Sequence, residues 1–133
     1  MTDRFEKGLN VRKDVLGAEH VARSMANVSE FNKEIQELVT SWCWGDIWTR
    51  EGISRRDRSL INLAILTAMN RNHEFKVHVK GALTNGCTPE EIKEVLLQTA
   101  VYCGVPAALE SFRNASEVLA EWEQETDGSS GRA

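Results

Sequence analysis

Hydrophobic residues recur along this chain at intervals of three and four positions, the spacing of a helix with one apolar face. No stretch shows the strict alternation of apolar and polar residues that is typical of a half-buried strand. Glycine, proline and capping residues divide the pattern into segments. These signals predict helices over residues 2–17, 18–26, 29–45, 54–69, 72–83, 88–102 and 105–122. The sequence therefore predicts an all-α fold.

Capping residues mark several of the helix starts. Thr2 and Ser29 are expected to cap the first and third helices. Ser54, with Asp57 three residues later, resembles a capping box. Thr88-Pro89-Glu90-Glu91 combines a cap, a proline at the first helical position and an acidic third position, so a helix is expected to begin there.

Two of the helices carry strong apolar faces. Gly45 is expected to end the third helix, which bears a stripe that predicts one buried side. The stripe consists of Phe31, Ile35, Leu38, Val39 and Trp42. The segment Leu60–Met69 is apolar nearly all round, so it is expected to be the central buried helix.

The composition indicates one compact domain. The chain has 133 residues, of which 41% are hydrophobic and two are proline, enough to build a single core. Residues 1–125 are expected to form this domain, and the Gly/Ser-rich residues 126–133 a disordered tail. A formal net charge of −4 argues against a nucleic-acid surface, which would need clustered basic residues.

The cysteines and the apolar runs indicate the compartment. Cys43, Cys87 and Cys103 lie far apart and form no Cys-x-x-Cys or zinc spacing, so reduced thiols are expected. The N-terminus lacks an apolar signal core, and no apolar run approaches the roughly 20 residues of a membrane span. A cytoplasmic protein without a membrane partner is expected.

An aromatic and arginine-rich segment suggests a ligand site. Trp44 and Trp48 precede a cluster of three arginines, Arg55, Arg56 and Arg58. Aromatic rings provide buried contact area, and guanidinium groups provide forked donors that match carboxylate oxygens. The segment therefore suits a small, flat, anionic ligand. Tryptophan is more often part of a core or a subunit interface, and that alternative stays open.

A series of motifs along the chain resembles one known family. The motifs are Glu6-Lys7-Gly8-Leu9, Arg12-x-x-Val15-Leu16-Gly17, Trp44-Gly45-x-x-Trp48, Arg55-Arg56-x-Arg58-Ser59-Leu60-Ile61, Glu74-x-x-x-His78-Val79, Ala82-Leu83-x-Asn85-Gly86-x-Thr88, Glu91-Ile92-x-Glu94-Val95-Leu96-Leu97-Gln98-Thr99-Ala100 and Gly104-x-Pro106-Ala107-Ala108. In order and spacing they resemble the gamma-carboxymuconolactone decarboxylases over about residues 4 to 119.

This resemblance implies a single-domain helical bundle of the alkylhydroperoxidase D-like type. It further implies a homo-oligomer, with a hexamer as the expected size, and no cofactor. The implied reaction is decarboxylation of gamma-carboxymuconolactone to the enol-lactone of beta-ketoadipate, in the protocatechuate branch of aromatic degradation. Losing carbon dioxide from an unsaturated lactone leaves an electron pair that flows into the ring carbonyl, so the substrate is its own electron sink.

His78 is the first choice for a proton donor or oxyanion partner, because imidazole changes charge near neutral pH. Glu74 lies one helical turn earlier, where it can orient and charge-stabilise the imidazole. The alternatives are a hydrogen-bonded structural histidine and a solvated carboxylate. Arg71 and Asn62 are weaker candidates for substrate binding.

Among the three arginines, Arg58 is favoured for substrate carboxylate binding and Arg55 is second. The two are three positions apart in the first turn of a helix, where exposed backbone N–H groups also favour an anion. The alternative is a set of surface ion pairs with Asp57, Glu51 or Asp46.

Two other function classes compete with the decarboxylase. Peroxidase-related relatives carry Cys-x-x-Cys-x-x-x-His, but Arg71 and Glu74 stand in place of the cysteines, which excludes a dithiol there. A non-catalytic helical oligomer of the same fold is the second alternative. No metal site is expected, because His73 and His78 point in different directions and Glu74 with His78 gives only two ligands.

Overall fold

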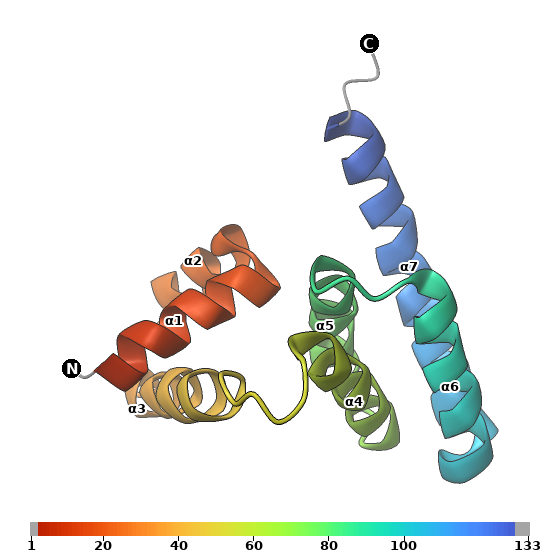
Figure 1. The fold of residues 1–133 in the computed structure, drawn as a ribbon, viewed down its shortest axis with the longest axis horizontal. Coiled ribbons are helices and arrows are strands. Elements are labelled where there is room, and N and C mark those ends of the chain that lie inside the picture. The colour runs from red at the N-terminus through yellow and green to blue at the C-terminus, as the bar shows by residue number, and fades with distance from the viewer. Residues whose placement is uncertain (1–2, 130–133) are drawn as a thin grey trace. The chain divides into compact units, whose positions relative to one another are not determined.

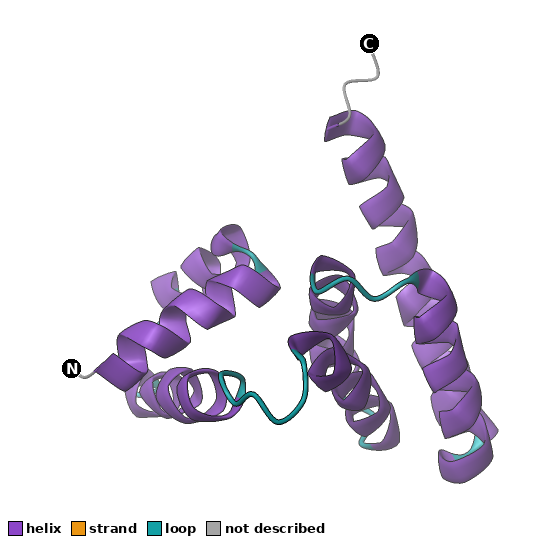
Figure 2. Ribbon diagram, in the orientation of Figure 1, coloured by secondary structure: helices purple, strands orange, loops and turns teal. Residues whose placement is uncertain are grey.

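The computed structural model describes residues 3 to 129, and every regular element in that range is a helix (Figure 2). The predicted all-α fold is confirmed. The chain divides into two compact units, an N-terminal unit up to Arg58 and a C-terminal unit from Ser59 onward. No helix in the described range is long and apolar enough to cross a membrane.

The N-terminal unit contains three α-helices and a π-helix: α1 (Asp3–Leu16), α2 (Ala18–Ala26), α3 (Lys33–Leu38) and η1 (Val39–Ile47). Gly17 has φ +93°, and this left-handed conformation separates α1 from α2 as the sequence predicted. α1 packs along η1, which continues directly from α3 (Figure 1).

The contact between α1 and η1 depends on two glycines. A Cβ atom added to Gly8 would overlap the carbonyl oxygen of Thr40, and one added to Gly45 would lie 2.5 Å from the carbonyl oxygen of Arg4. Gly45 therefore lies inside η1, where the backbones approach closely. The prediction that Gly45 ends the helix was wrong, because packing rather than helix termination requires a glycine here.

The core of the N-terminal unit forms where α1 packs against η1. Its buried apolar residues are Val11, Val15, Leu16, Val21, Trp44 and Trp48. The predicted buried stripe lies elsewhere: Phe31 is 96% exposed, Ile35, Leu38 and Trp42 are also exposed, and Val39 is half-buried. The prediction of a buried stripe was wrong because α1 covers Thr40, Trp44 and Gly45 instead.

The C-terminal unit begins at Ser59 within α4 (Arg55–Ala68) and also contains α5 (Asn72–Thr84), α6 (Pro89–Cys103) and α7 (Val105–Ser129). α6 and α7 are joined at Gly104, which has φ +107°, and they lie side by side (Figure 1). Side chains from all four helices meet in one core: Leu63, Phe75, Val79, Ala82, Leu83, Cys87, Ile92, Leu96, Ala115 and Val118.

Two predicted helix starts are confirmed by their hydrogen bonds. The Ser54 hydroxyl accepts from the backbone N–H of Asp57 at 3.0 Å, and α4 begins at the next residue, Arg55. At α6, the Thr88 hydroxyl accepts from the Glu91 N–H at 3.1 Å, and the Thr88 N–H donates to the Glu91 carboxylate at 2.9 Å. The caps predicted at Thr2 and Ser29 are not confirmed. Thr2 lies outside the described residues, and α3 begins after Asn32 rather than Ser29.

Two predictions about the C-terminal unit were wrong. α4 is fully buried only along Ser59, Leu63 and Thr67, because Leu60 and Leu66 cover the core only partly and Ile61 and Ile65 are exposed. α7 continues past Trp122 to Ser129, so its last turn includes residues 126–129 of the predicted tail. Residues 130–133 lie outside the described range.

Candidate active site

Of the three clustered arginines, Arg55, Arg56 and Arg58, it is Arg58 that makes no ion pair among residues 3–129. Its Nη2 donates to the carbonyl oxygen of Arg50 at 3.3 Å, while its Nε is buried without a hydrogen-bond partner in the described chain. A buried N–H group without a hydrogen-bond acceptor destabilises the folded protein. The Arg58 guanidinium is therefore suited to donate a hydrogen bond to an acceptor on a ligand.

The other two arginines of the cluster contact acidic side chains. Arg55 lies 3.5 Å from the carboxylate of Asp14, and Arg56 lies 3.9 Å from that of Asp57. Asp14 was not among the partners that the sequence suggested. These contacts support the preference for Arg58 over its neighbours.

Trp44 and Trp48 stack on each other inside the N-terminal unit. Their ring centroids are 4.8 Å apart with 23° between the planes, and both side chains are buried. In this chain the two rings form part of the core, and their role as walls of a ligand site stays a prediction.

The C-terminal unit brings together Asn62 of α4 and His78 of α5. The Asn62 amide nitrogen lies 3.4 Å from Nδ1 of His78, and both residues are half-buried. The sequence named these two residues separately, without a signal that would pair them. Their contact links a predicted catalytic residue of α5 to α4.

Glu74 and Arg71 lie on the same helix as His78 or at its start. Glu74 is one turn before His78 and exposed, and no hydrogen bond links the two within the described chain. Arg71 precedes the first residue of α5, where its side chain is exposed. The roles assigned to both stay predictions. No group of three or more possible metal ligands occurs within residues 3–129.

Helix α4 carries two of the candidate residues in register. Arg58 and Asn62 are four positions apart in one continuous helix, so they lie on the same face, about one turn from each other. Arg58 is suited to a carboxylate, and the imidazole beside Asn62 is suited to a developing oxyanion. Binding a carboxylate and stabilising an oxyanion are what the removal of carbon dioxide requires of a protein.

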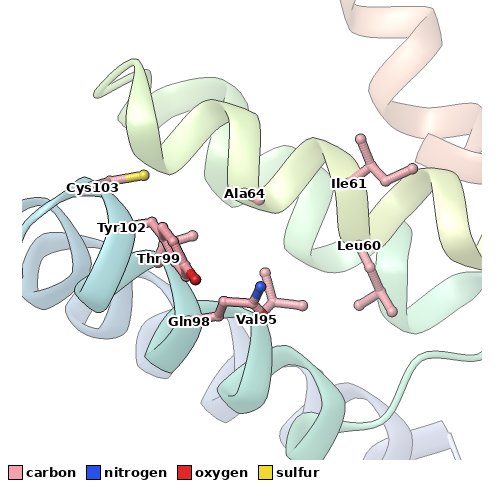
Figure 3. A pocket seen from close by; sticks show the side chains of 8 residues that line it. All are labelled: Leu60, Ile61, Ala64, Val95, Gln98, Thr99, Tyr102 and Cys103. Atoms are coloured by element: carbon pink, nitrogen blue, oxygen red, sulfur yellow. The ribbon is translucent and has the colours of Figure 1, made fainter.

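A cavity of about 370 Å³ lies between α4 and α6 in the C-terminal unit (Figure 3). Its lining residues are Leu60, Ile61, Ala64, Val95, Gln98, Thr99, Tyr102 and Cys103. No basic side chain is among them, which does not match a dianionic ligand. The helical repeat also directs Asn62 away from the side of α4 that carries Leu60 and Ala64.

The sequence did not identify a buried cation in the N-terminal unit. Arg12 is 7% exposed and donates to Gln36 and Thr40, each at 3.2 Å. Burial lowers the pKa of Arg12, while the nearby Cys43 acts in the opposite direction. Burial likewise raises the pKa of the Cys43 thiol, although Arg12 and a hydrogen bond with Trp48 oppose this shift. The Cys43 thiol is therefore held in its less reactive, protonated form.

We expect the three cysteines to be dispensable for catalysis. All three are free thiols; Cys87 is buried in the core and Cys103 is exposed. Replacing Cys43 and Cys87 by Ala and Cys103 by Ser should leave the turnover rate largely intact, with a loss of stability from the cavity at Cys87. Steady-state kinetics on the folded triple variant would measure this, and abolished turnover would indicate a thiol-dependent mechanism.

The fold and site define an all-helical protein whose candidate groups can hold a carboxylate and an oxyanion. A model of the Carboxymuconolactone decarboxylase family matches residues 33–117. The chain is 39% identical over 116 residues to a 4-carboxymuconolactone decarboxylase of Acinetobacter baylyi, covering 87% of both chains. It is 43% identical over 108 residues to a nitrosuccinic acid decarboxylase of Metarhizium robertsii, covering 81% of this chain and 76% of that one.

The chain belongs to the carboxymuconolactone decarboxylase family. It is a decarboxylase, and therefore a carboxy-lyase. The predicted family membership and enzyme class are confirmed.

Proposed function

We propose that the protein decarboxylates gamma-carboxymuconolactone to the enol-lactone of beta-ketoadipate, without a cofactor, as a step of protocatechuate degradation. The observation that carries this proposal is the 39% identity to a 4-carboxymuconolactone decarboxylase across 87% of both chains. The site contributes Arg58, which makes no ion pair within the described chain, and the Asn62–His78 contact.

These protein groups can support the reaction because the substrate itself delocalises the electron pair that the departing carbon dioxide leaves behind. Breaking the bond to the carboxylate carbon sends the electrons through the double bond to the lactone carbonyl oxygen. Arg58 is placed to bind a substrate carboxylate, and His78 to interact with the oxygen that becomes negative. Glu74, Arg55, Arg71, Trp44 and Trp48 complete the proposed set of site residues.

A second substrate is favoured by the similarity to nitrosuccinic acid decarboxylase, which is 43% identical over 108 residues. Nitrosuccinate also carries two carboxylates, and its nitro group accepts the electron pair as a nitronate. The same protein groups would therefore serve both reactions. The chemistry that the two substrates share is loss of a carboxylate from a carbon whose electron pair can be delocalised onto oxygen, directly into the nitro group or through the double bond into the lactone carbonyl.

A direct assay tests both substrates. Purified protein would be added separately to freshly generated gamma-carboxymuconolactone and to nitrosuccinate, and released carbon dioxide and organic product would be measured. Faster turnover of the lactone supports the main proposal, and faster turnover of nitrosuccinate supports the second. Turnover of neither would favour the non-catalytic oligomer, while peroxide-dependent activity would favour the redox alternative.

Arg58→Lys should weaken substrate binding more than it slows the chemical step. An ammonium group cannot reproduce the forked contact of a guanidinium with a carboxylate. Losing a charge-assisted hydrogen bond of about 1.5–3 kcal/mol should raise KM by roughly 10- to 100-fold. The matched control is Arg56→Lys, because Arg56 already contacts Asp57, and KM should stay close to wild type. Equal KM values for the two variants would contradict the assignment.

We propose that the protein is a cytoplasmic homo-oligomer, with a hexamer as the expected size. Exposed apolar side chains on both units support assembly, including Phe31 and Trp42 in one and Val101 and Tyr102 in the other. Light scattering at micromolar concentration should give the mass of a stable oligomer. A monomer would contradict the proposal.

A further inference from the structure

The contact between Asn62 and His78 bears on which nitrogen of the imidazole ring carries the proton. The Asn62 amide nitrogen faces Nδ1 of His78 at 3.4 Å. An amide NH₂ group can only donate a hydrogen bond, so Nδ1 must accept and cannot carry a proton. In a neutral imidazole the proton is then on Nε2.

We propose that Asn62 is a positioning residue that holds His78 as a neutral imidazole with its proton on Nε2. In this state His78 donates a hydrogen bond to the substrate oxygen on which negative charge develops. It acts as an electrophile and is not the source of the proton that the carbon receives. This inference rests on the proposed decarboxylation and assigns the role of His78 within it.

Four charged residues lie within about one turn of His78 or Asn62 along their own helices. Imidazolium would place an Nδ1–H against the Asn62 amide N–H, and two donors facing each other repel. Lys76 and Lys80 are two positions before and after His78, and both contact glutamates of α7, Glu117 and Glu125. The other charged residues to consider are Glu74, exposed one turn earlier on α5, and Arg58, one turn before Asn62 on α4.

The chemical step balances with His78 keeping its proton throughout. The bond between the reacting carbon and the carboxylate breaks, carbon dioxide leaves, and the electron pair moves to the oxygen that Nε2–H contacts. The carbon then takes a proton from water, and the resulting hydroxide combines with carbon dioxide. The overall change is R–CO₂⁻ + H₂O → R–H + HCO₃⁻.

Nitrogen NMR of ¹⁵N-labelled protein measures the tautomer directly. The chain has three histidines, so the His78 signals can be identified by their loss in His78→Gln. Wild-type protein should show His78 neutral, with its proton on Nε2, at the pH of the assay. A proton on Nδ1, which would mean that the amide is turned the other way, or an imidazolium would overturn the proposal. This measurement needs no substitution at Asn62.

Asn62→Asp then tests the cause, because a carboxylate can only accept and should draw the proton to Nδ1. Asn85→Asp is the matched control: Asn85 donates to the Ser59 hydroxyl at 2.9 Å, and its replacement should leave the His78 spectrum unchanged. With the wrong tautomer, kcat of Asn62→Asp should fall by about 10- to 1,000-fold with little change in KM.

The two proposals fail in different ways. If neither substrate is turned over while His78 shows the Nε2 tautomer and Asn62→Asp moves the proton to Nδ1, the proposed substrate is wrong and the assignment of the tautomer to Asn62 stands. If the substrate is turned over but Asn62→Asp changes neither the His78 spectrum nor kcat, the positioning role is overturned.

Discussion

His78→Ala is expected to lower turnover by roughly 100- to 10,000-fold, with a much smaller effect on substrate binding. The alanine variant loses the group that interacts with the oxygen on which charge develops, and that interaction is stronger in the transition state than in the bound substrate. Steady-state kinetics should therefore show the loss in kcat. His78→Gln should retain more activity, because its amide can place an N–H close to the position of Nε2.

The control for this prediction lies on the same helix. His73 is exposed at the start of α5, so His73→Ala should keep a turnover rate close to wild type. Glu74→Gln should give a loss smaller than that of His78→Ala, because it removes only a neighbouring charge. Circular dichroism and light scattering would first establish that each variant is folded and assembled. Near-normal decarboxylation by folded His78→Ala would show that another group, or ordered water, performs this role.

Gly8→Ala is expected to destabilise the N-terminal unit strongly. The added methyl group would overlap the carbonyl oxygen of Thr40, and it would lie 2.8 Å from the backbone nitrogen of Gly45. Backbone atoms cannot rotate away as a flexible side chain can, so α1 and η1 would have to separate. We expect the free energy of unfolding to fall by about 3 kcal/mol, the upper end of the usual overpacking penalty, or by more. Urea denaturation followed by far-UV circular dichroism would measure the change.

A second glycine provides the comparison. An added Cβ at Gly52 meets no atom within 4 Å. Gly52→Ala should therefore leave stability unchanged or raise it by up to about 1 kcal/mol, through the less flexible unfolded chain. If Gly8→Ala were as well tolerated as Gly52→Ala, the close packing of α1 against η1 would be contradicted.

Local signals predicted the helices well where they act through neighbouring residues. The capping box at Thr88 and Glu91 fixed the start of α6, and Gly104 fixed its end. The end of α7 was missed, since Glu123, Gln124 and Glu125 are good helix formers and the first glycine after Trp122 comes only at position 128. Gly45 was misread because close packing and helix termination both use glycine, and only tertiary contacts distinguish the two.

The site could be predicted only in part, because its arrangement depends on tertiary contacts that local sequence patterns do not encode. A periodic stripe such as Phe31, Ile35 and Leu38 indicates an apolar face but not which surface covers it. The sequence selected His78 through its family motif and Arg58 through its place in the chain. The contact of Asn62 with Nδ1 joins two helices across 16 positions, and no local pattern encodes such a pairing.

The stacked indoles of Trp44 and Trp48 also give the molecule a built-in optical reporter. Indole rings held in one fixed packing give a near-UV dichroic signal, which is lost when that packing is lost. Both rings belong to the N-terminal unit, whereas Trp122 is half-buried in α7 of the C-terminal unit. Thermal unfolding followed by the near-UV circular dichroism of the stacked pair reports mainly on the N-terminal unit. The far-UV signal reports on all helices together. Coincident curves would mean one cooperative transition, and separate curves would assign each half of the chain its own melting temperature.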